Sequence, residues 1–125
     1  MSEAPAPGPG DRALTWVEGR LGDVHPELAE AVRRCVGEVR GTASAASVAE
    51  ALADAATAEL AAVARGPQDR AAAVRLLAAD AVLTYAFEAV AEEGGDPAAL
   101  AERVGPRGTL GRALADAART TGEVG

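Results

Sequence analysis

The stretch SVAEALADAATAELAAVARGPQDRAAAVRLLAADAVLTYAFEAVAEEGG, residues 47–95 of this 125-residue chain, decides its fold. Alanine is the strongest helix former and a weak strand former, and the larger apolar residues recur every three or four positions, so the stretch predicts two helices. Gly66-Pro67 separates them, and Gly94 ends the second, which begins near Gln68. The short connection favours antiparallel packing, and we expect this hairpin at the centre of the fold.

The rest of the chain predicts shorter helices at about 11–21, 26–40, 97–104 and 110–120. Pro26 suits a first helical turn, and Asp96 suits the cap of the helix that follows it. No segment shows the two-residue alternation of a strand. The predicted fold class is therefore all-α: a compact antiparallel bundle of five to six helices with a long central hairpin of the third and fourth helices.

The predicted helices divide the chain into three parts. Residues 1–10 are expected to form a flexible arm rich in Pro, Ala and Gly, residues 11–120 a single helical-bundle domain, and residues 121–125 a frayed tail.

Composition excludes several functional classes. Twelve basic against nineteen acidic residues give a net charge of -7, which repels nucleic acids. One Cys and one His are too few for a zinc site or a disulfide scaffold. No apolar run reaches the roughly 18 residues of a membrane span. A single Cys without an export signal favours the cytoplasm.

One carboxylate breaks the local pattern of the fourth helix. At about 100° per residue, Asp80 lies within the arc of Leu76, Leu83 and Phe87. A buried carboxylate must be paired or protonated, so we expect Asp80 to be an ion-paired or ligand-binding residue, unless neighbouring helices cover the stripe incompletely. Thr84 lies one turn further on and would share the contacts of Asp80.

The other side of the fourth helix is also apolar. Val74 and Tyr85 lie nearly opposite the main stripe, which is typical of a helix that is central in a bundle or half covered by another subunit. Trp16 points away from the apolar side of the first helix. It either folds over a neighbouring helix or anchors an interface, so Trp16, Val74 and Tyr85 are candidate interface residues.

No catalytic, cofactor-binding or metal-binding residues are assigned, because a single His allows no triad or ligand pair that spacing alone supports. The sequence thus favours a non-enzymatic cytoplasmic protein that acts through protein–protein contact, as a homodimer or a small accessory subunit. The alternative is a small-molecule carrier or sensor with an apolar pocket near Tyr85, Phe87 and Asp80. An enzyme that uses Asp80 as an acid or base is a third hypothesis.

Overall fold

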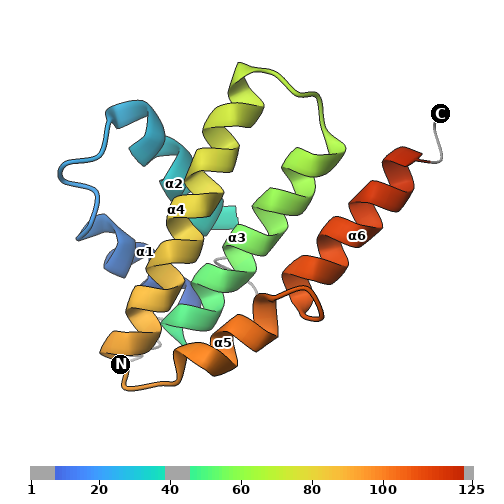
Figure 1. The fold of residues 1–125 in the computed structure, drawn as a ribbon. Coiled ribbons are helices and arrows are strands. Elements are labelled where there is room, and N and C mark those ends of the chain that lie inside the picture. The colour runs from blue at the N-terminus through green and yellow to red at the C-terminus, as the bar shows by residue number, and fades with distance from the viewer. Residues whose placement is uncertain (1–7, 39–45, 123–125) are drawn as a thin grey trace, which may run out of the picture.

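The computed structural model describes residues 8–38 and 46–122 and contains six helices within them, with no strand there (Figure 1). In chain order they are α1 (Pro9–Glu18), α2 (Pro26–Glu38), α3 (Val48–Arg65), α4 (Arg70–Glu92), α5 (Pro97–Val104) and α6 (Thr109–Gly122). The all-α fold class is confirmed. The α3–α4 hairpin forms the most extensive helix–helix contact, as the sequence predicts.

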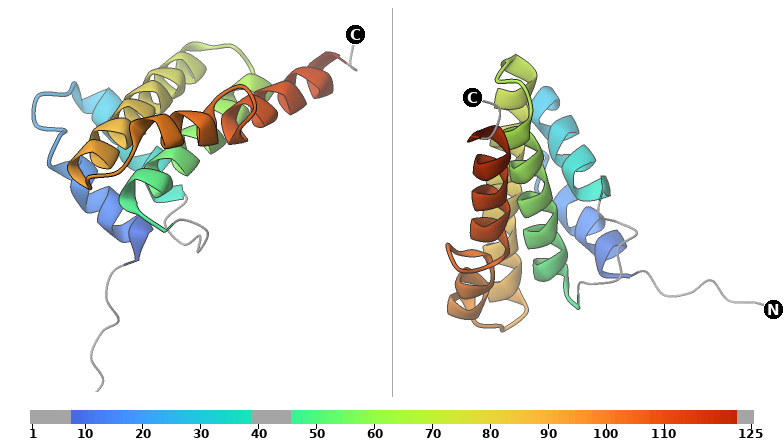
Figure 2. Two further views of the ribbon diagram at one scale, coloured as in Figure 1. Left: turned by 60° about the horizontal axis from the view of Figure 1, so that its bottom comes forward. Right: turned by 90° about the vertical axis from the view of Figure 1, so that its right-hand side faces the viewer.

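The centre of the bundle is α3 rather than α4. Figure 2 shows α3 between α6 on one side and α1 and α2 on the other, and α4 and α5 also pack against it. Nine of its 18 residues are buried, whereas six of the 23 residues of α4 are buried. The fourth helix, which the sequence favours as the central one, therefore borders α3 and keeps one side free.

Helix ends follow the expected caps, with small shifts. Ser47 and Asp96 cap α3 and α5, and Asp69 caps α4, which starts two residues later than expected. Pro9 begins α1, so residues 9 and 10 of the expected arm are helical; α6 likewise extends through residues 121 and 122 of the expected tail. Residues 1–7, 39–45 and 123–125, with the rest of the arm and tail, lie outside the described residues.

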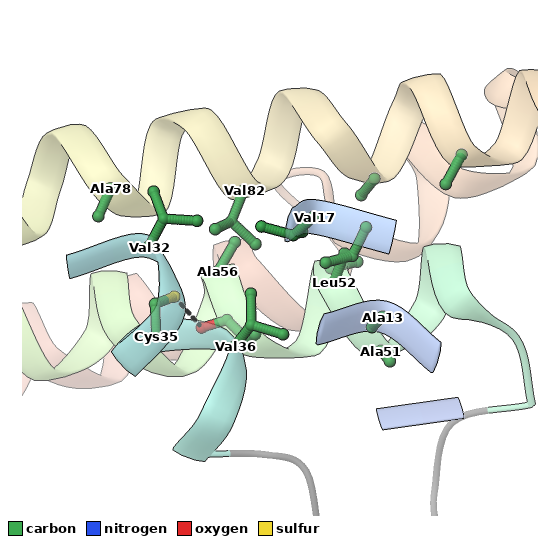
Figure 3. Close-up of a cluster of buried hydrophobic side chains, with 14 of the residues drawn as sticks. Ala13, Val17, Val32, Cys35, Val36, Ala51, Leu52, Ala56, Ala78 and Val82 are labelled. Atoms are coloured by element: carbon green, nitrogen blue, oxygen red, sulfur yellow. Dashed lines mark hydrogen bonds between the residues drawn. The ribbon is translucent and has the colours of Figure 1, made fainter. Parts of the chain in front are cut away.

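Small side chains fill the core. Figure 3 shows Ala78 and Val82 of α4 beside Val32 of α2, with Leu52 and Ala56 of α3 beneath them. All five are fully or almost fully buried. Because alanine leaves little side chain between two backbones, the helices approach closely, and packing at this density leaves no space for larger groups.

The buried face of α4 lies between the two apolar sides that its sequence shows. Alanines and one valine make up this face: Ala72, Ala78, Ala79, Val82, Ala86 and Ala89. The residues on its two edges are larger and only partly covered. We call Val74 and Tyr85 the inner flank, which faces α1 and α2, and Leu76, Leu83 and Phe87 the outer flank, on the opposite edge.

Candidate functional site

Asp80 and Thr84 are exposed. Of the alternatives for Asp80, the structure therefore shows incomplete cover of the stripe, and neither residue is a buried polar group. The hydroxyl of Thr84 donates a hydrogen bond to the backbone carbonyl of Asp80 over 3.0 Å, a contact within one helical turn. The physical reason is that the alanine face, and not the leucine stripe, packs against α3. Asp80 lies beyond the outer flank of α4, where water solvates its carboxylate.

Two of the three candidate interface residues contact each other within the chain. The rings of Trp16 and Tyr85 meet edge to face, with centroids 5.9 Å apart and planes at 65°. The indole Nε1 donates to Glu92 over 2.7 Å. Trp16 thus folds over a neighbouring helix and holds α1 against the inner flank of α4, which is the first of the two alternatives for this residue.

A cation completes this cluster. The guanidinium of Arg20 lies 3.6 Å from the centre of the Trp16 ring. It also donates to Glu88 over 3.1 Å and to Glu92 over 2.9 Å. The hydrogen bonds from Trp16 and Arg20 favour the charged form of Glu92 and so lower the pKa of its carboxyl group. The inner flank is consequently covered by groups of the same chain around Tyr85.

Val74 lies on the inner flank further along α4, where α2 and α4 form a groove. Charged side chains dominate this part of the groove: Glu27, Glu30, Arg34, Arg70 and Arg75 line it with Val74. Arg70 donates to Glu27 across the groove over 3.0 Å. Arg75 donates over 2.8 Å to Glu59 of α3, which is only 3% exposed.

The Glu59–Arg75 pair was not anticipated from the sequence. A buried carboxylate requires a charged or hydrogen-bonding partner, and Arg75 supplies it from the neighbouring helix. The composition of α3 could have revealed it. This helix is apolar on nearly every side, so its few acids are the residues for which a partner has to be sought. Glu59 occupies a position on the side that faces the core.

The outer flank has no comparable cover. Leu76 is 48% exposed, and Leu83 and Phe87 are partly buried against the core. On α6, Leu114 is 38% exposed. Figure 1 places α4 and α6 on either side of α3, so these leucines belong to two helices that border the same central helix.

The alternative pocket near Tyr85, Phe87 and Asp80 gains no geometric support. Residues two apart on a helix point to different sides, and Tyr85 faces Trp16 while Phe87 lies on the outer flank. Asp80 is exposed. These three side chains do not converge on one cavity.

Cys35 lies in the core, with its Sγ 3.6 Å from the carbonyl oxygen of Ala55. Burial and the nearby charge of Glu59 raise the pKa of the thiol to about 12, so it is protonated at neutral pH. Among the described residues, no group of three or more His, Cys, Asp or Glu is placed to hold a metal ion. No helix in the same part of the chain has the length and hydrophobicity to cross a membrane.

Comparison with protein-family models, curated proteins and solved structures gives no significant match.

Proposed function

We propose that this protein is a non-enzymatic helical-bundle protein that acts through protein–protein contact, as a homodimer or as a small accessory subunit. The observation that supports this most is the way α4 packs. It buries its alanines and leaves Leu76 48% exposed beside Leu83 and Phe87. Single exposed leucines are common, but a row of large apolar side chains along one helix is typical of a contact surface.

The contact surface we propose is the outer flank of α4. The sequence alone favours Trp16, Val74 and Tyr85 for this role. Trp16 and Tyr85 already contact each other within the chain, whereas Leu76 of the outer flank is 48% exposed. The single Cys supports the cytoplasm as the place of action.

Light scattering after size exclusion tests the homodimer. We expect the full chain to show the mass of two chains, and Leu76→Glu to show the mass of one, because a carboxylate at the contact loses its hydration. Ala99→Glu introduces the same charge at an exposed residue of α5 and should leave the dimer intact.

A wild-type protein that is monomeric at every concentration would contradict the homodimer. The accessory-subunit form is then tested with a photo-crosslinking residue at position 76 in the cells that make the protein, with position 99 as the control. Equal crosslinking from the two positions would contradict this form as well.

A further inference from the structure

We propose that the outer flank of α4 binds an amphipathic helix of a partner protein, with a basic residue of that helix opposite Asp80. This inference rests on the proposed function and deepens it, since it states which kind of partner the contact surface takes. It holds whether or not two copies of the chain also associate there when the partner is absent.

The spacing along the outer flank is that of a surface on which a second helix packs. Leu76, Leu83, Phe87 and Val90 follow one another at intervals of seven, four and three residues, and Asp80 completes the alternation of four and three. We call these five residues the contact row. Such an alternation keeps residues on one side of a helix and suits a second helix at a shallow angle. The contact row is roughly 21 Å long at 1.5 Å per residue, so one helix of ordinary length covers it.

The contact row is accessible and its backbone is already ordered. Leu76 is 48% exposed, and Asp80 is exposed at the solvent edge. Leu83, Phe87 and Val90 are partly buried against the core. The alanine face of α4 packs against α3, so the backbone that carries the contact row is held before a partner binds. This lowers the entropy lost on binding.

Asp80 determines the charge that the partner helix must carry. The two arginines of α4, Arg70 and Arg75, are bound to Glu27 and Glu59. Asp80 has no ion-pair partner among the described residues. A helix laid along the contact row removes water from this carboxylate, so a Lys or Arg opposite it supplies a partner, whereas an acid there is repelled. The net charge of -7 also attracts a basic helix over longer distances.

A second copy of this chain does not supply the basic residue. In a symmetric dimer the same surface lies on both sides of the contact, and none of the five residues of the contact row is basic. A partner helix with a basic residue makes the same apolar contacts and adds the charge pair with Asp80. We therefore expect it to displace a second copy wherever the two compete.

Fluorescence polarisation of a labelled designed peptide, titrated with the full chain, tests the inference. The peptide is a helix of about four turns with leucines at the same spacing and one Arg among them. The Arg is placed second from one end or second from the other, so that both directions of the helix are tested. We expect saturable binding of one of these two Arg peptides, and weaker binding when its Arg is replaced by Glu.

Substitutions at Asp80 then test the charge pair. Asp80→Asn should weaken the Arg peptide about fivefold, because an ion pair covered by the bound helix is lost. Asp23→Asn removes the same charge from an exposed residue of the α1–α2 connection and should change the affinity far less. Asp80→Arg should reverse the preference, so that the Glu peptide binds more tightly than the Arg peptide.

Three results would overturn the inference. The first is equal binding of the Arg and Glu peptides to the wild type, and the second is an equal loss of affinity in Asp80→Asn and Asp23→Asn. The third is the absence of saturable binding with both Arg peptides. In all three cases selective crosslinking from position 76 would still support the proposed function. If the Arg peptide bound Leu76→Glu as tightly as the wild type, it would bind elsewhere, and equal crosslinking from positions 76 and 99 would then contradict the proposed function as well.

Discussion

The two flanks of α4 are similarly apolar in sequence but differ in what covers them. Tyr85 on the inner flank meets the ring of Trp16, and Glu88 and Glu92 bind Arg20 from the same neighbouring segment. Leu76 on the outer flank is 48% exposed. The difference teaches that helical periodicity shows which sides of a helix are apolar, whereas the size of the residues between them determines which side packs closely.

The largest effect is expected from filling the alanine face that separates the flanks. Ala86 is 0% exposed, so Ala86→Leu inserts a larger side chain where the alanine face packs against its neighbours. It should lower the free energy of unfolding by about 3 kcal/mol. The matched change Ala91→Leu, at an exposed residue of the same helix, should alter it by less than about 0.5 kcal/mol. Urea denaturation measures the unfolding free energy of both variants. Equal losses would show that the alanine face is not tightly packed.

A smaller loss of unfolding free energy should follow when the cover of the inner flank is removed. Trp16→Ala removes the ring contact with Tyr85, the Arg20 stacking and the hydrogen bond to Glu92. Because Trp16 is only half-buried, we expect a loss of about 2 kcal/mol in unfolding free energy, less than for a fully buried Trp. Leu76→Ala should cost less than about 0.5 kcal/mol in the isolated chain. If Leu76→Ala proved the more damaging of the two, the assignment of the flanks would be reversed.

The smallest effect is expected when the pH is lowered and Glu92 becomes protonated. Glu92 has a pKa below its ordinary value of 4.5 in the folded protein, so its charged form is favoured by folding. Its contribution to stability is therefore complete above about pH 4.5 and is lost as the pH falls through the lowered pKa. The fluorescence of Trp16, the only Trp, should report this step. Glu92→Gln should abolish it, and an unchanged titration in that variant would assign the step to another carboxylate.

Much of the fold was predictable from local signals. Gly66-Pro67 and Asp96-Pro97 mark helix ends by their backbone chemistry alone, and alanine enrichment rules out strands. The start of α1 at Pro9 also follows a local rule, since proline suits the first helical turn, but the surrounding Pro and Gly residues obscured it.

The candidate site was harder to predict, because it depends on which helices become neighbours. Asp80 falls within the largest apolar arc of α4, yet the smaller alanines form the buried face and leave it in water. The contacts of Trp16 with Tyr85 and of Arg75 with Glu59 join residues of different helices. No spacing within one helix reports such contacts.

The reactivity of a thiol at position 76 tests the contact surface most directly. Cys35 is buried and protonated, so a Leu76→Cys variant carries one reactive thiol among the described residues. We expect alkylation at position 76 to slow several-fold from dilute to concentrated protein, or on addition of extract from cells that make the protein, while Ala99→Cys reacts at a constant rate. Alkylation at position 76 that proceeds at the same rate under all three conditions would contradict a contact role for the outer flank.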